Sequence, residues 1–528
     1  MSIRNETQEI PSLTRRLISG GDERLNLDED GLNKYGCAPV PRDVMPLGSC
    51  TSATASLRAW NAAMHYGKLI DESLCCRSPQ QVAEVHANEI REEITNWLAL
   101  DELQPEIFLA PSGTDIELLV LALVAEMQSR PLLNIVVGPG EIGSGSRLAA
   151  AGLHYASQLA SGGRAVPGEP VNVQLARSVE VAEVQVRARD GGAFPQAVVD
   201  AEVTSHLEEA RRNQRGVILH VVAHSKTGVH APSLGLVNRI IEDDPNVVVL
   251  IDAAQGRFSR RGAKEILKRG CWLLVTGSKF FGGPAFSGAL LVPQQCLDAR
   301  VRGAELPTGI ADYFCAADLP VSFARARSKL GDRTNFGLLL RWRAALAEIA
   351  TYYKADPHAR LQVLRHFESE LPRILTASPY ITLLDESEPL HSNEAERLLE
   401  SKRTVFSFAV SDDNGRRLGI TELKSLVNLL NKDMSDAWPL TLNTEEKLLS
   451  SKCFHIGQPV IIGDESYSDP LSVVRVALGG RLISDVATGA LPLEGDSLEA
   501  RLDWMSRQLH DLRRKIDLIA RHATVLGM

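Results

Sequence analysis

The chain contains 528 residues, of which 44 % are hydrophobic and 23 % charged, and its formal net charge is −9. This composition excludes the disordered and fibrous classes, and the acidic balance argues against a bulk nucleic-acid binder. No apolar run reaches about 18 residues, and we expect neither a secretory signal nor a membrane partner. Eight cysteines without a C-x-x-C pair are typical of reduced thiols. We therefore expect a soluble, cytoplasmic protein of about two to four domains, with no metal site.

The order of the predicted elements indicates four regions. Residues 1–80 are polar and then helical, and we expect this N-terminal segment to contribute to the functional site. Residues 81–335 alternate helical stretches with short apolar runs, which predicts a large α/β domain with a mainly parallel, buried sheet. Residues 336–490 are predicted to form a smaller C-terminal α+β domain, followed by a helix within 491–528. The strands expected in the large domain are 134–137, 217–222, 247–251, 272–275 and 289–292.

The C-terminal region has a heptad pattern of apolar residues. They step by four and three, as in the a/d seam of a coiled coil. Two interpretations stay open: a short coiled coil between subunits, or a terminal helix docked on its own domain, which this length favours. The residues of the seam are Leu498, Leu502, Met505, Leu509, Leu512, Ile516 and Ile519.

A small turn and a strand end carry polar groups suited to a ligand. Gly113 and Thr114 open a helix-forming run, and a helix start offers free N–H groups and a positive dipole end to a phosphate. Asp252 follows the strand 247–251, and ligands of open parallel sheets bind beyond the carboxyl ends of the strands. Taken alone, the turn is an ordinary helix cap, and the aspartate could cap a helix, hold a metal or pair with a protonated ring nitrogen.

A lysine follows the strand 272–275 within a turn rich in hydroxyls and glycine. Lys279 lies next to Ser278 and three residues after Thr276. A lysine at the end of a buried strand is costly unless it has a partner. A Schiff base with an aldehyde cofactor removes this charge and creates an electrophile. The alternative for a single lysine is an exposed position in a turn.

Together, the three segments resemble a known family. The order of a phosphate-type helix start, a strand-end Asp252 and, 27 residues later, Lys279 is similar to that of the fold-type I pyridoxal-phosphate (PLP) enzymes. The resemblance is to the aminotransferase class V and cysteine desulfurase-like group, and it covers roughly residues 80–490. It implies a PLP-dependent transferase fold of type I, PLP as the cofactor and a homodimer with active sites at the interface.

The resemblance also implies roles for the residues of the PLP site. Lys279 corresponds to the lysine that binds the cofactor aldehyde and later moves the Cα proton. Asp252 corresponds to the partner of the ring nitrogen, since a nearby carboxylate keeps that nitrogen protonated. Gln255 is similar to the residue that contacts the phenolic oxygen. The phosphate site implied by the resemblance comprises Gly113, Thr114, Thr276 and Ser278.

Weaker matches extend this site. His224 or Ser225 is expected to touch the ring oxygen, although a polar loop that caps a strand is an equal alternative. Thr334 resembles the segment that reaches the phosphate of the neighbouring subunit. Arg475 resembles the arginine that binds the substrate α-carboxylate, the alternative being an internal ion pair. Ser49, with its neighbours Cys50 and Thr51, is expected to contact the substrate, and a plain turn is the alternative.

Two positions depart from the family pattern. The stretch that begins Glu141-Ile142 lacks the histidine that stacks on the cofactor ring. Ile456 stands where the longer cysteine desulfurases have their sulfur-accepting cysteine, and an isoleucine provides no nucleophile. Cys453, three residues earlier, would need a different loop path to replace it. We therefore do not expect desulfurase activity.

The implied function is that of a PLP-dependent enzyme acting on an amino-acid-type substrate through an external aldimine and a Cα carbanion. An aminotransferase-type reaction ranks first. The alternatives are a PLP-dependent lyase, a decarboxylase or a carbon–carbon bond-forming enzyme. A non-catalytic PLP-binding homologue is less favoured, because Lys279 and Asp252 are both present.

Overall fold

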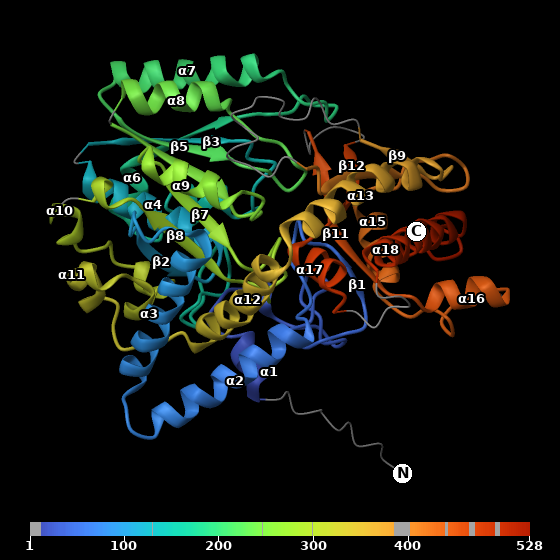
Figure 1. Cartoon of the computed structure of the whole chain (residues 1–528). Coiled ribbons are helices and arrows are strands. Elements are labelled where there is room, and N and C mark those ends of the chain that lie inside the picture. Colours follow the sequence, from blue (N-terminus) through green and yellow to red (C-terminus); the bar gives the residue numbers. More distant parts are fainter. Residues whose placement is uncertain are drawn as a thin grey trace, which may run out of the picture.

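The computed structural model describes residues 12–528 except 129, 245, 298, 385–401, 439–441, 464–469 and 491–496. The described residues form two β-sheets that lie next to each other and are covered by helices (Figure 1). The larger sheet belongs to the middle of the chain, and the smaller one combines C-terminal strands with one strand from the N-terminal segment.

The central sheet has seven strands in the described part of the chain, in the order β2-β8-β7-β6-β5-β3-β4. The five strands from β7 to β4 are parallel, while β8 pairs antiparallel with both β7 and β2. All residues of β3, β5 and β7 are buried, as expected for strands covered on both faces. The predicted α/β architecture is therefore confirmed. The strands are β2 Glu106–Ala110, β3 Leu132–Val137, β4 Val179–Val184, β5 Gly216–Val222, β6 Val247–Ala253, β7 Trp272–Thr276 and β8 Gly288–Val292.

Helices cover both faces of the central sheet because successive strand residues point to opposite faces. Ile218 and Leu250 face the apolar helix α4, Gly113–Met127. Leu219 and Ile251 belong to the core on the other face. The helices of that second layer are α3 Pro79–Leu98, α7 Gln196–Arg212, α8 Leu234–Asp243 and α9 Arg260–Lys268.

The smaller sheet has the strand order β1-β11-β12-β10-β9. Strand β1 comes from the N-terminal segment and pairs parallel with β11, whereas the other pairs are antiparallel. The N-terminal segment is thus attached to the C-terminal strands. The strands are β1 Met45–Leu47, β9 Ile381–Leu383, β10 Val405–Val410, β11 Phe454–Ile462 and β12 Leu471–Ala477.

The long helix α12, Phe336–Lys354, lies between the two sheets in Figure 1. It begins at Asn335, whose side chain caps the helix by accepting from the Leu338 N–H. It packs against α2, α3 and α17, so its buried side chains hold the two parts together. The remaining helices are α1 Ser12–Leu17, α2 Leu57–Leu74, α5 Ser146–Ala150, α6 Val173–Arg177, α10 Ala299–Arg302, α11 Ala324–Ser328, α13 Pro357–Thr376, α15 Ile420–Leu430, α16 Thr444–Ser451 and α17 Gly480–Thr488.

The C-terminal helix α18, Leu498–Arg521, is docked on its own chain. It packs against α13, α15, α16 and α17. Met505, Leu509, Leu512 and Ile516 of the heptad seam are completely buried there. This arrangement is the docked alternative of the two that the heptad pattern left open.

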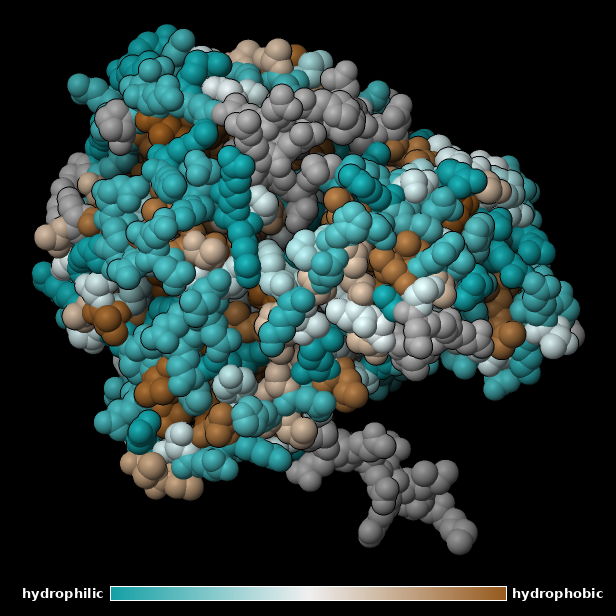
Figure 2. Space-filling model, in the orientation of Figure 1, coloured by the Kyte–Doolittle hydropathy of each residue, from teal (hydrophilic) through white to brown (hydrophobic). Residues whose placement is uncertain are grey.

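Polar side chains cover most of the face shown in Figure 2, with hydrophobic residues scattered between them. Scattered apolar residues are normal on a protein surface. Among the helices of the described residues, none has the length and the hydrophobicity that a membrane span requires.

The packing of α18 predicts a specific loss of stability. Because Leu512 is fully buried, Leu512→Ala should lower the free energy of unfolding by about 2–5 kcal/mol. The exposed Arg507 on the same helix is the control, and Arg507→Ala should change it by less than about 0.5 kcal/mol. Urea denaturation measures both. A loss that varies with protein concentration would contradict docking within one chain.

Candidate active site

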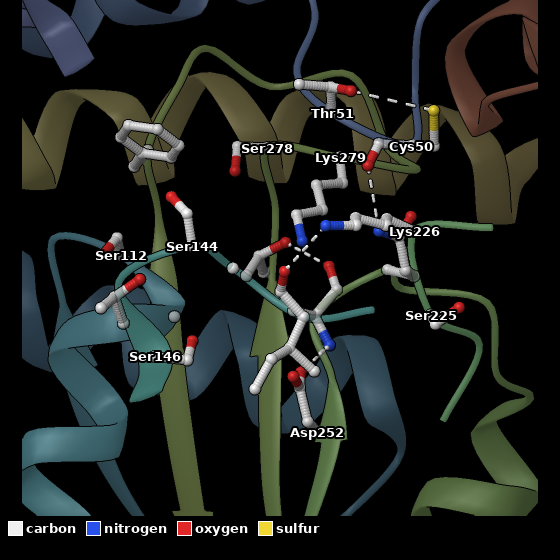
Figure 3. A pocket seen from close by; sticks show the side chains of 18 of the residues that line it. Cys50, Thr51, Ser112, Ser144, Ser146, Ser225, Lys226, Asp252, Ser278 and Lys279 are labelled. Atoms are coloured by element: carbon white, nitrogen blue, oxygen red, sulfur yellow. Dashed lines mark hydrogen bonds between the residues drawn. The ribbon is translucent and has the colours of Figure 1, made fainter. Parts of the chain in front are cut away.

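A cavity of about 290 Å³ lies at the carboxyl ends of β5, β6 and β7, next to the N-terminus of α4 (Figure 3). Ligands of open parallel sheets bind at this edge. Three parts of the chain meet there, namely the loops of the central sheet, the N-terminal segment and the smaller sheet. The last two contribute Arg24, Lys34, Thr51, Gln458 and Arg475.

Lys279 reaches into this cavity from the turn after β7 (Figure 3). Burial lowers the pKa of Lys279 below the ordinary lysine value, and the charge of Asp252 acts in the opposite direction. No carboxylate of the described residues forms an ion pair with this amine within 4.0 Å. A lowered pKa increases the share of the neutral amine, which is the nucleophilic form.

Asp252 lies at the end of β6, at the base of the cavity. The register places it opposite Val222 of β5 and Leu274 of β7. Its Oδ1 accepts from the Ala254 N–H at 3.0 Å, and its carboxylate faces the cavity (Figure 3). The position suits a partner for a protonated ligand nitrogen.

A buried ion pair lies near Asp252. The Nδ1 atom of His220 on β5 is 2.8 Å from the Glu117 carboxylate on α4, and both residues are buried. Burial opposes protonation of His220, but the nearby Glu117 carboxylate outweighs it and raises the pKa of His220. The pair joins β5 to α4 next to the strand end that carries Asp252.

The N-terminus of α4 forms one wall of the cavity. Gly113 and Thr114 line it, and Ser112 caps the helix. The Ser112 hydroxyl donates to Asp115 at 2.5 Å, and an Arg24 Nη2 donates to Ser112 at 3.0 Å. Burial raises the pKa of Asp115 to about 6. The helix start therefore has free N–H groups and a nearby arginine, which suits an anion.

Several predicted contact residues line the cavity but also bind other parts of the chain. Ser278 and Thr276 are in the lining, and the Thr276 hydroxyl donates to the Ala254 carbonyl at 2.7 Å. The Gln255 amide donates to the Cys50 carbonyl at 3.0 Å. Gln255 thus attaches the N-terminal segment to the end of β6.

A buried network of Glu141, Arg187, Ser225 and Thr227 holds the loop after β5. Glu141 accepts from Arg187 Nε at 2.5 Å, from Ser225 at 2.6 Å and from Thr227 at 2.7 Å. Burial opposes ionisation of Glu141, but Arg187 and the two hydroxyls lower the pKa of Glu141 overall. His224 lines the cavity from the same loop, in a left-handed conformation with φ +54°. The Glu141 network fixes this loop.

Arg475 lies on β12 and is 2 % exposed. Its Nη1 donates to the Lys226 carbonyl at 3.1 Å and its Nη2 to the Thr51 hydroxyl at 3.3 Å. Its Nε has no hydrogen-bond partner, and no carboxylate pairs with it, among the described residues. Arg475 therefore forms no internal ion pair with any described residue, which was the alternative that the sequence left open. A buried guanidinium without a counter-ion favours an anionic ligand.

Residues 49–51 were expected to contact the substrate, with Ser49 first among them, but the structure does not place Ser49 at the cavity. Ser49 does not line the cavity, because its hydroxyl donates to the Ala477 carbonyl and accepts from Arg257. Thr51, two residues later, does line it. Cys50 lines the cavity as well, and its side chain also packs with Val405 and Ala477 in an apolar cluster. Thr51 is thus better placed than Ser49 to contact a substrate.

The structure places both positions at which the sequence departs from the family pattern, Ile456 and the stretch that begins at Glu141. Ile456 is fully buried in β11 opposite Leu47, outside the cavity lining. Cys453 also lies outside it. Ile142 lines the cavity and occupies the stretch that lacks the ring-stacking histidine. No group of three His, Cys, Asp or Glu side chains suited to a metal occurs among the described residues.

Thr334 lies outside the cavity lining of its own chain, and its expected contact with the phosphate of a neighbouring subunit stays a prediction. Arg24, Lys34 and Lys226 line the cavity but were not predicted. Arg24 and Lys34 have no local signal, since only the folded chain brings the N-terminal segment to the strand ends, whereas Lys226 follows His224 and Ser225 in the loop after β5.

Solved structures show the same fold. A complex of the cystine C–S lyase C-DES with its product cysteine persulfide is 15 % identical, covers 90 % of this chain and 98 % of its own, and has a TM-score of 0.50. A lysine-to-alanine mutant of C-DES with glycine covalently linked to its PLP cofactor is 14 % identical over 90 % of this chain and 97 % of its own, also with a TM-score of 0.50. A cysteine desulfurase from Thermococcus onnurineus is 12 % identical over 89 % of this chain and 95 % of its own, with a TM-score of 0.48. No protein-family model and no curated protein matches the sequence.

These similarities confirm the predicted fold class, the type I fold of PLP-dependent enzymes. The side chains of this chain also fit such a cofactor. The buried Lys279 amine can bind an aldehyde, Asp252 can pair with a ring nitrogen, and the N-terminus of α4 can hold a phosphate.

The lowered pKa of Lys279 predicts a pH-dependent cost in stability. Burying the ammonium form destabilises the folded protein at every pH below the folded-state pKa, and the cost vanishes as the pH rises through the unfolded-state pKa. Lys279→Met should therefore raise the Tm of the ligand-free protein at pH 7 and lose this advantage above about pH 10.4.

Thermal unfolding between pH 6 and pH 11 measures the effect. Lys354→Met, at an exposed position, is the control and should leave the Tm nearly unchanged at pH 6 and at pH 11. An equal gain for Lys279→Met at all pH values would contradict the explanation by charge burial.

Proposed function

We propose that the protein is a PLP-dependent enzyme that acts at the Cα atom of an amino acid and works as a homodimer. One observation carries the proposal: a buried lysine amine, a strand-end carboxylate and an arginine that pairs with no carboxylate of the described residues line the same cavity. Lys279 suits the aldehyde of this cofactor, Asp252 suits its ring nitrogen, and Arg475 suits the α-carboxylate of an amino acid.

Each part of the cofactor has residues that suit it. Lys279 would bind the aldehyde carbon, and Asp252 would hold the proton on the ring nitrogen. Gly113, Thr114 and Ser278 would bind the phosphate at the start of α4. When bound, PLP withdraws electrons from the Cα atom of the attached amino acid and thereby acidifies its Cα–H bond.

The remaining chemistry belongs to side chains of the chain. Arg475 binds the α-carboxylate through charge-assisted hydrogen bonds and so orients the Cα atom. The Lys279 amine, whose pKa burial lowers, would be the base that accepts the Cα proton. The Asp252 carboxylate would lie opposite the ring nitrogen and keep a proton on that nitrogen.

Two reactions can follow removal of this proton. In transamination, which the sequence favours, the same base returns the proton to a neighbouring carbon, so Lys279 alone is sufficient. In elimination, a leaving group departs from Cβ and needs a proton donor of its own. A second lysine amine in the cavity, that of Lys226, supports elimination as the second candidate.

Reconstitution with PLP tests the proposal. Borohydride reduction followed by peptide mass spectrometry should locate PLP on Lys279. Lys279→Ala should lose covalent attachment and at least about 10³-fold in turnover, since it lacks both the nucleophile and the base. Lys354→Met is the control and should retain both. Attachment at another lysine would contradict the assignment.

Arg475 predicts a defect in substrate affinity. Arg475→Gln should raise the KM for an amino acid about 100-fold, or about 3 kcal/mol, because the buried carboxylate loses its charged partner. Arg475→Lys should recover part of this loss, since it keeps the charge but not the two parallel bonds. Steady-state kinetics separates KM from kcat, and a KM unchanged in Arg475→Gln would contradict the role.

A further inference from the structure

A serine whose hydroxyl has no partner lines the cavity. Ser287 comes directly before β8 and is completely buried. Its hydroxyl forms no hydrogen bond with any of the described residues. Buried hydroxyls are normally hydrogen-bonded, because burying one without a partner costs stability. The cavity is therefore the place from which a partner for this hydroxyl can come.

The backbone around Ser287 is fixed in the cavity wall. The Ser287 carbonyl accepts from the Gly277 N–H at 3.0 Å. The neighbouring carbonyls, those of Phe286 and Gly288, accept from side chains of α12 at 2.7 Å and 3.1 Å. The serine thus keeps its place in the wall even though its hydroxyl gains nothing there.

The guanidinium of Arg24 lies next to this segment. It stacks on the ring of Phe286, 4.6 Å from the ring centroid. Its Nη2 donates at 3.0 Å to Ser112, the cap of α4, and its Nε donates to the two Asp22 oxygens at 2.8 Å and 2.9 Å. Arg24 lines the cavity and Asp22 does not. The positive end of this ion pair therefore faces a ligand.

The buried Arg341 of α12 joins the N-terminal segment to the wall of the cavity. Its Nη1 donates to the Leu17 carbonyl at 2.8 Å and to the Ser19 carbonyl at 2.6 Å, while its Nε donates to Phe286. Leu25 packs with Phe286 in an apolar cluster. These contacts hold together two segments that are far apart in the sequence.

Both segments meet at the helix start at which the cofactor phosphate is proposed to bind. A Cβ atom on Gly288 would be 3.1 Å from the backbone of Ser112, so the chain before β8 lies against the cap of α4. Here the Ser287 hydroxyl and the Arg24 guanidinium lie beside the free N–H groups of the helix. A phosphate group has several acceptor oxygens, and a guanidinium matches their geometry.

We propose that Arg24 and Ser287 bind the phosphate of the cofactor, so that the N-terminal segment supplies a charged ligand-binding residue. The inference rests on the proposed function, and it extends the phosphate site beyond the residues at the start of α4 and in the lysine turn. The family resemblance gave a role to neither residue. Both residues then favour PLP over pyridoxal, which lacks the phosphate.

Titration of the ligand-free, full-length protein with PLP and with pyridoxal tests this selectivity. Arg24→Gln should raise the Kd for PLP about 10–100-fold and Ser287→Ala about 10-fold, because each removes a hydrogen bond to a charged group. The Kd for pyridoxal should change less than about 2-fold in both. Arg24→Lys should recover part of the loss, since it keeps the charge. The exposed Arg507→Gln is the control and should bind both compounds as the wild type does.

Thermal unfolding of the ligand-free protein separates ligand binding from a structural role. Ser287→Ala removes a buried hydroxyl without a partner, so it should not lower the Tm. Ser407 is the matched control, because it is also completely buried, its hydroxyl has no partner in the described part of the chain, and it lies outside the cavity lining. Ser407→Ala should likewise not lower the Tm, and it should leave the Kd for PLP unchanged. A lower Tm for Ser287→Ala would mean that the hydroxyl is structural and would overturn its role.

The outcomes distinguish this inference from the proposed function. If PLP attaches to Lys279 but Arg24→Gln and Ser287→Ala bind it as tightly as the wild type does, this inference fails and the proposed function stands. Equal losses for PLP and pyridoxal would mean that the two residues only support the wall, which also overturns the inference. If the wild type binds neither compound, the proposed function fails and this inference fails with it.

Discussion

The burial of an amine beside a carboxylate, at the ends of two adjacent strands, is the constraint on which the rest of the site depends. Asp252 ends β6, and Lys279 follows β7, its parallel neighbour. Both strands are covered on their two faces, so a shift of register by one residue would turn their apolar side chains toward the wrong layer. The core therefore fixes the two charged groups, and the surrounding loops adapt to them.

The charged side chains around the cavity are of two kinds. Some pair with another side chain of the protein, and others are left for a ligand. Glu141 is neutralised by Arg187, and Glu117 lies against His220. Each of these pairs joins segments that are separate in the sequence, which stabilises the cavity wall. Arg475 has no such partner among the described residues. Because an unpaired buried charge is costly, the arginine indicates a site shaped for an anion that the chain does not itself provide.

The sequence was informative wherever a property is local. Asp252 and Lys279 could be predicted because apolar strands mark the edge at which their side chains emerge. Strand β4 was not predicted, since Glu180 and Glu183 interrupt its apolar run at the edge of the sheet. The cavity residues of the N-terminal segment, such as Arg24, could not be predicted either, because their position depends on contacts with distant parts of the chain. The Glu141 network also depends on distant contacts and could not be predicted. For α18, the heptad pattern fitted both a coiled coil between subunits and docking on the same chain.

The pairing of β1 with β11 has a consequence for biosynthesis. Met45 lies opposite Phe454, so the segment that carries Thr51 reaches its place only after nearly the whole polypeptide has left the ribosome. Until then the central sheet can fold while one side of the cavity is still missing. Pairing over so long a stretch of chain is intrinsically slow. Nascent or C-terminally shortened chains should therefore be compact yet incompetent for ligand, and competence should arise abruptly at the end of translation.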